Sequence, residues 1–113
     1  MEELIMKLED EEFSGVVQVC ESLKKRARKG DQRVLNVMER LALDDKKPNV
    51  ERLAAFDTFL YVVKDDDFNA VYSVLYKVLQ SEDDILDPFL SMLRGKSHIW
   101  AGYWRDGFGH IHR

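Results

Sequence analysis

The sequence predicts an all-α protein, an up-and-down bundle or short stack of about five to six antiparallel helices. Apolar residues recur at the three- and four-residue spacing of helix faces between residues 11 and 94. No stretch before residue 96 alternates apolar and polar residues as a half-buried strand does. The connections are short, so consecutive helices should be antiparallel neighbours. We expect a single domain over residues 1–113, with a helical bundle in 1–95 and an aromatic, histidine-rich tail in 96–113 packed on it.

The centre of the predicted bundle is a pair of helices over residues 49–64 and 68–80. Apolar residues leave only a narrow polar strip on the first, so neighbours should cover it on more than one side. They fill about half the circumference of the second. We expect Asn49 to cap the first helix and Asp66 or Asp67 to cap the second.

The N-terminal part predicts a short helix or frayed lead-in over residues 1–8 and a firmer helix over 11–29. Acidic residues 9–12 at the start of that helix, and basic residues at its end, suit the helix dipole. Gly30 stands where a left-handed residue ends a helix. Gly15 falls inside this helix and weakens it by about 1 kcal/mol relative to alanine, which a backbone passing close by would explain.

Capping residues locate the other helices. Asp31 is expected to cap a helix over residues 32–43, and Ser81 is expected to start the last helix immediately after it. Pro88 can interrupt or restart that helix, and Gly95 closes it.

Composition restricts the function classes. The single cysteine, Cys20, excludes an internal disulfide and a multi-cysteine zinc site, so we expect a reducing, cytoplasmic compartment (or the nucleus of a eukaryotic host). No run of about 18 apolar residues predicts a membrane span, and the acidic start does not resemble a signal peptide. A net charge of −4 argues against a dedicated nucleic-acid binder. We find no catalytic motif, and expect no enzymatic activity and no cofactor.

Two residues of the predicted core carry chemistry. Cys20 lies between Val16 and Leu23 on an apolar face, where a thiol packs and nothing activates it as a nucleophile. Asp57 lies among apolar residues of the central helix and needs a partner, which Lys64 or a tyrosine hydroxyl is expected to supply.

The tail has a composition of its own. Asp106-Gly107 is a good hairpin turn between aromatic residues, while a helix over residues 97–104 or disorder are competing readings. The aromatic side chains either seal one side of the bundle or form an exposed platform that docks a partner. His98, His110 and His112 form an incomplete ligand set, so a metal-binding tail is the least favoured function.

Alternation of the turns predicts a charged pole. Residues 9–12, 44–47 and 82–87 would gather at one end of an up-and-down bundle, with a summed charge of about −8. The opposite end would carry about +3. A chain this polarised would steer charged partners at low salt.

The favoured function is therefore a non-enzymatic protein–protein interaction module or inhibitor, acting on a possibly basic partner protein through the acidic pole or the tail. In size and acidity the chain resembles the bacterial immunity proteins, which neutralise basic nuclease toxins, although no motif residue carries over. The expected partner-binding residues are Trp100, Tyr103, Trp104, Arg105, Phe108, Glu82, Asp83 and Asp84.

The alternative is a nucleic-acid-associated adaptor that uses a basic cluster, with Trp100 or Trp104 stacking on bases. Five basic residues exceed what the helix dipole needs at the end of the 11–29 helix. The cluster comprises Lys24, Lys25, Arg26, Arg28, Lys29 and Arg33.

Overall fold

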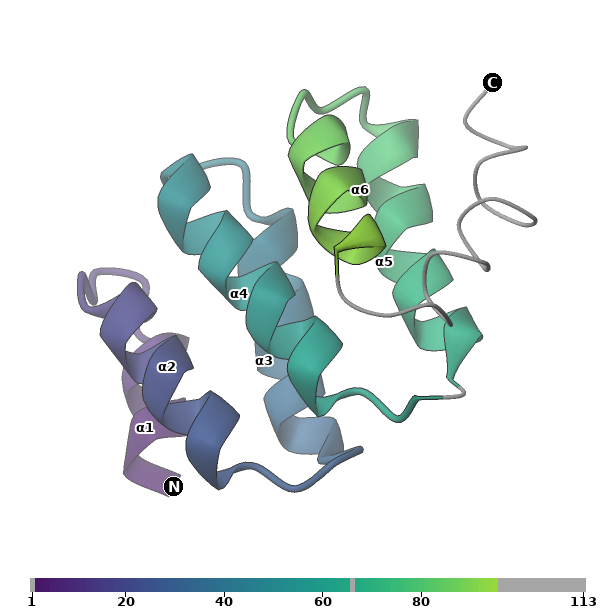
Figure 1. The fold of residues 1–113 in the computed structure, drawn as a ribbon. Coiled ribbons are helices and arrows are strands. Elements are labelled where there is room, and N and C mark those ends of the chain that lie inside the picture. The colour runs from purple at the N-terminus through teal and green to yellow at the C-terminus, as the bar shows by residue number, and fades with distance from the viewer. Residues whose placement is uncertain (1, 66, 96–113) are drawn as a thin grey trace. The chain divides into compact units, whose positions relative to one another are not determined.

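The structure, a computed structural model, describes residues 2–65 and 67–95, and every regular element among them is an α-helix (Figure 1). The predicted all-α class is therefore confirmed. The chain divides into two compact units, Met1–Lys64 and Asp65–Arg113. The prediction of a single domain stays a prediction. No helix of the described residues is long and apolar enough to span a membrane. The first unit holds α1 (Glu2–Glu9), α2 (Val16–Arg26), α3 (Gln32–Leu43) and α4 (Asn49–Val62), and the second holds α5 (Phe68–Gln80) and α6 (Leu86–Arg94).

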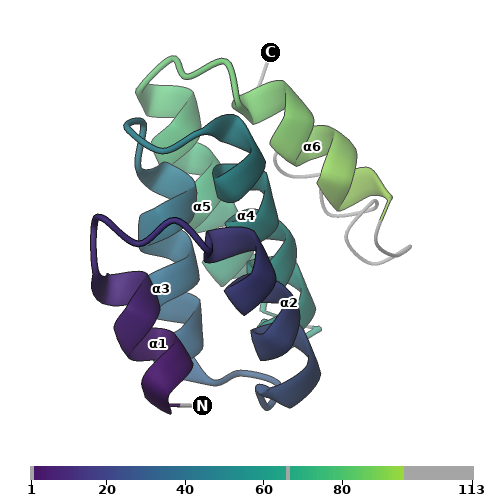
Figure 2. The same cartoon turned by 90° about the vertical axis from the view of Figure 1, so that its left-hand side faces the viewer.

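Helix α4 organises the first unit. It packs against both α2 and α3, while α1 lies against α2 and α3 (Figure 2). Phe56 and Phe59 of α4 are buried, with stacked rings whose centroids are 6.4 Å apart. The prediction that neighbours cover this helix on more than one side is confirmed.

The N-caps of α3 and α5 lie where the sequence places them. Asp31 Oδ1 accepts hydrogen bonds from the amides of Arg33 and Val34, at 3.1 and 3.3 Å. Asp67 Oδ1 accepts one from the amide of Ala70 at 3.2 Å. Each carboxylate satisfies amides that have no partner within the helix.

The predicted helix over residues 11–29 is wrong at both ends, because α2 covers only Val16–Arg26. Acidic residues 9–12 belong to the end of α1 and to the following loop, so they do not complement the α2 dipole. Gly15 occupies the α2 N-cap position, where the ring of Phe13 lies close: an added Cβ would be 2.7 Å from Phe13 Cζ. That neighbour is a side chain of the same loop, not a passing backbone.

Gly30 is left-handed as predicted, with φ of +82°, but it does not end a helix. The α2 C-cap is Ala27, three residues earlier, and the Gly30 amide donates to the carbonyl of Val62 at 2.6 Å. Its conformation therefore serves the connection between α2 and α3, which turns against the end of α4.

Two other predicted caps are corrected. Pro48 occupies the α4 N-cap position without a side-chain hydrogen bond, and Asn49 is the first helical residue. Ser81 ends α5 instead of starting α6, because its hydroxyl donates to the carbonyl of Val78 at 3.0 Å. The chain then passes through Glu82 in the left-handed region, with φ of 56°, which interrupts any helix there. Gly95 closes α6 as predicted.

Arginines of neighbouring helices donate hydrogen bonds to carbonyl groups at the C-terminal ends of α1 and α3. Arg40 Nη2 donates to the carbonyl of Leu8 at 3.1 Å. Arg52 Nε donates to the carbonyl of Ala42 at 3.0 Å, and only 3% of Arg52 is exposed. Both guanidinium groups meet the negative end of a helix dipole, where last-turn carbonyls lack partners within the helix.

Candidate functional site

A shallow hollow of about 360 Å³ lies in the second unit, where α5 ends and α6 begins. Its floor is apolar, formed by Val78, Leu79 and Leu86. Four acidic residues also line it, and we call them the acidic turn. They are Glu82, Asp83, Asp84 and Asp87.

Local backbone bonds hold the acidic turn in place. The amide of Glu82 donates to the carbonyl of Leu79 at 3.1 Å, and the amide of Asp83 donates to that of Val78 at 3.4 Å. Asp83 Oδ1 then accepts from the amide of Ile85 at 3.1 Å. These bonds fix the direction in which the chain enters α6, and all four acidic residues line the hollow.

The acidic turn presents strong negative charge to solvent. Glu82, Asp84 and Asp87 are exposed. Within residues 67–95, no ion pair neutralises Glu82 or Asp84. Such a concentration of like charge over an apolar floor attracts cations and raises their association rate at low salt.

The structure brings together three predicted partner-binding residues, Glu82, Asp83 and Asp84, and adds Asp87 to them. The apolar floor was missed, because Val78 and Leu86 have the sequence signature of ordinary core residues. The other predicted partner-binding residues lie outside the described residues, and so do the tail hairpin and the histidine site. They are Trp100, Tyr103, Trp104, Arg105, Phe108, His98, His110 and His112.

Two of the three clusters of the predicted charge pole meet within the first unit. Lys47 Nζ donates to the carbonyl of Glu11 at 2.9 Å, so the turns after α1 and after α3 meet at one end. Residues 82–87 belong to the second unit. Their addition to this end therefore stays a prediction.

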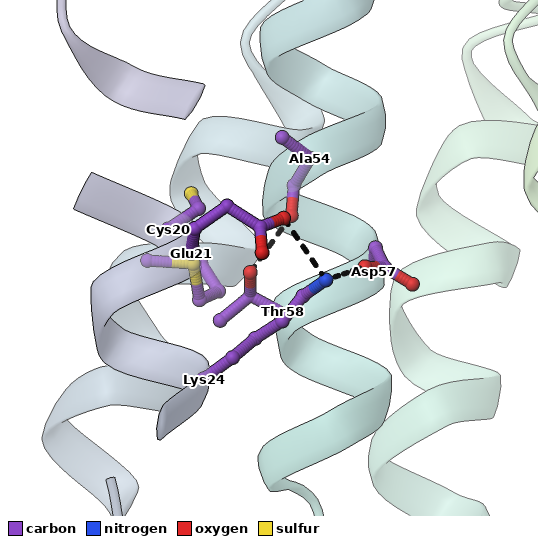
Figure 3. A network of polar contacts seen from close by, with 7 residues as sticks. Cys20, Glu21, Lys24, Ala54, Asp57 and Thr58 are labelled. Atoms are coloured by element: carbon purple, nitrogen blue, oxygen red, sulfur yellow. Dashed lines mark hydrogen bonds and ion pairs between the residues drawn. The ribbon is translucent and has the colours of Figure 1, made fainter. Parts of the chain in front are cut away.

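A second polar cluster joins α2 to α4 (Figure 3). Lys24 of α2 forms an ion pair with Asp57 of α4 and a second one, at 3.2 Å, with Glu21. The Lys24 and Asp57 side chains are each 20% exposed. Lys24 therefore replaces Lys64 or a tyrosine hydroxyl as the charge partner expected for Asp57. Sequence spacing could not reveal it, because the pair depends on which helix packs against α4.

Cys20 belongs to the same cluster (Figure 3) and is 1% exposed. Its Sγ is 3.8 Å from Met38 Sδ. Burial raises the pKa of the thiol to about 11, outweighing the opposite effects of the Thr58 hydrogen bond and of the Lys24 charge. The predicted core role is confirmed, and the protonated thiol is no nucleophile at neutral pH.

We expect this cluster to make the protein sensitive to alkali. The folded thiol keeps its proton above pH 9.0, where an unfolded thiol loses it, so stability falls as pH rises. Burial lowers the pKa of Lys24, but its hydrogen bonds to Asp57 and Glu21 raise it more, and the net shift is upward. The stability that Lys24 contributes is therefore present below pH 10.5 and lost as pH rises through its raised pKa.

Urea unfolding at pH 8 and pH 10 measures the effect. Between these values the thiol is expected to remove about 1.4 kcal/mol of unfolding free energy. Cys20→Ala should abolish this part of the loss. An unchanged pH dependence in Cys20→Ala would contradict the assignment to the thiol.

Two residues of the predicted basic cluster are held in ion pairs. Lys24 is committed to Asp57, and Arg33 forms ion pairs with Glu2 and, at 4.0 Å, with Glu9. The other members are exposed around the end of α2: Lys25, Arg26, Arg28 and Lys29.

Comparison with known proteins found no matching family model, no matching curated protein and no matching solved structure. Within residues 2–65 and 67–95, no group of three or more His, Cys, Asp or Glu residues is arranged to hold a metal ion. The acidic turn is thus the candidate site that geometry and charge favour.

Proposed function

We propose that this protein is a non-enzymatic interaction module that binds a basic partner protein through the acidic turn. The observation that carries the proposal is that four acidic residues and three apolar residues line the same hollow. Tight protein interfaces commonly combine a buried apolar anchor with a surrounding polar rim. The hollow offers an apolar surface for the anchor, and the acidic turn offers the polar rim.

The partner is expected to present an apolar side chain flanked by lysines or arginines. A volume of about 360 Å³ has room for one large side chain on Val78, Leu79 and Leu86. Arginine is the better flanking residue, since its planar guanidinium can bond a carboxylate with two hydrogen bonds. Long-range attraction would speed association, and salt would screen it.

The test begins with affinity purification from the native host and identification of the bound proteins. Affinity for a purified partner is then measured with the full chain and with Glu82→Lys/Asp84→Lys. We expect the reversal to weaken binding at least about tenfold, mainly through slower association. Added salt should also weaken binding of the unmodified chain.

A matched control reverses two exposed acids of the first unit, Glu3→Lys/Glu12→Lys. It changes the net charge equally and should leave most of the affinity intact. Equal losses in both variants would show that net charge, not the acidic turn, attracts the partner. A binding affinity that does not change with salt concentration would also contradict the proposal.

A further inference from the structure

The connection between α2 and α3 lies against the end of α4 (Figure 1). The Gly30 amide donates to the carbonyl of Val62 at 2.6 Å, and Lys29 Nζ donates to the carbonyl of Val63 at 3.5 Å. These bonds bring the basic residues that follow α2 next to the last turn of α4, about thirty residues later in the chain.

Lys64 joins the basic residues through the same contact. Its side chain lies over Gly30, where an added Cβ would be 2.7 Å from Lys64 Cε. The result is a surface of five exposed cations, which we call the basic end. It comprises Lys25, Arg26, Arg28, Lys29 and Lys64.

Two members of the sequence-predicted cluster do not contribute to the basic end. Lys24 and Arg33 are held in ion pairs with carboxylates of their own unit. The nearby carboxylate of Asp31 accepts two amide hydrogen bonds at the start of α3. Among the described residues, Lys25, Arg26, Arg28 and Lys64 form no ion pair, so no carboxylate is paired with these four cations.

The last turn of α4, which binds the α2–α3 connection, also carries an exposed aromatic residue. Tyr61 is 55% exposed and directly precedes Val62, whose carbonyl binds the Gly30 amide. A tyrosine beside a cluster of cations matches the two needs of a single-stranded nucleic acid, phosphate contacts and base stacking. A site that bound only phosphate groups would not require an aromatic side chain.

We propose that the basic end binds single-stranded nucleic acid, with its cations on consecutive phosphates and one base stacked on Tyr61. This site lies in the first unit and is independent of the acidic turn. Tyr61 is the proposed stacking residue of this site, whereas Trp100 and Trp104 lie outside the described residues. Overall acidity limits the affinity, so binding should be moderate and strongly salt-dependent.

Fluorescence anisotropy of the full chain with a labelled single-stranded oligothymidylate tests the proposal. We expect binding at about 50 mM salt, because phosphate contacts are strongest there. Lys25→Glu/Arg26→Glu/Arg28→Glu should weaken it at least about tenfold and flatten the plot of log affinity against log salt by about two. Tyr61→Ala should weaken it about fivefold or more, and Tyr61→Phe should not.

The matched control is Lys7→Glu/Lys46→Glu/Lys77→Glu, which reverses three exposed cations elsewhere. It should retain most of the binding. No binding by the unmodified chain, or equal losses in both triple variants, would overturn the proposal. Tighter binding to a duplex of the same length, or binding to vesicles of anionic phospholipid without binding to the oligonucleotide, would overturn the single-stranded assignment.

Discussion

Phe56→Ala is expected to lower the free energy of unfolding by about 3–5 kcal/mol. Phe56 is 0% exposed and stacks on Phe59, so the truncation removes buried apolar area and leaves a cavity. α4 carries the contacts with both α2 and α3, and its rigid surroundings can collapse only partly into that space. Urea or thermal unfolding followed by circular dichroism gives the value.

Val50→Ala is the control for this prediction. Val50 lies on the same helix but is 62% exposed, so its truncation should change the free energy of unfolding by less than about 0.5 kcal/mol. A similar loss in both variants would mean that Phe56 is not part of a packed core.

Arg52→Ala is expected to lower the free energy of unfolding by about 3 kcal/mol. The substitution leaves the carbonyl of Ala42 without its guanidinium donor and removes the packing of a long, buried side chain. It also removes the positive charge at the C-terminal end of α3. Equilibrium unfolding in urea at neutral pH measures the loss.

Arg40→Ala separates the effect of burial from that of the hydrogen bond. Arg40 makes the same kind of bond, to the carbonyl of Leu8, but it is exposed. Its loss should cost about 1 kcal/mol or less, because water can replace the guanidinium. Equal effects of the two substitutions would show that burial does not strengthen the Arg52 contact.

The two proposed surfaces lie in different units of the chain. The acidic turn is formed by residues 82–87 of the second unit, whereas the basic end belongs entirely to the first unit. The charge reversals in each unit should therefore affect one activity and spare the other. This separation allows either proposal to fail without the other.

Helical periodicity and local caps were sufficient to predict the all-α class and the extents of α3 and α5. These features depend on residues close together in the chain, where side-chain spacing and capping hydrogen bonds act directly. The core position of Cys20 also followed from its neighbours at helical spacing. Three residues of the acidic turn, Glu82, Asp83 and Asp84, were predicted as a short acidic run, and the structure added Asp87.

Contacts between helices could not be predicted in this way. The pairing of Lys24 with Asp57, the donation by Arg52 to Ala42 and the meeting of Lys64 with Gly30 each join different elements. Their partners depend on which helices pack against each other. The spacing of residues along the chain does not show which helices are neighbours. The start of α2 was predicted too early for a related reason. Apolar periodicity continued the helix back to residue 11, whereas Phe13 and Gly15 belong to the loop before α2, with the Phe13 ring against Gly15. Local chemistry determined the helices, and tertiary packing decided which charges remain on the surface for partners.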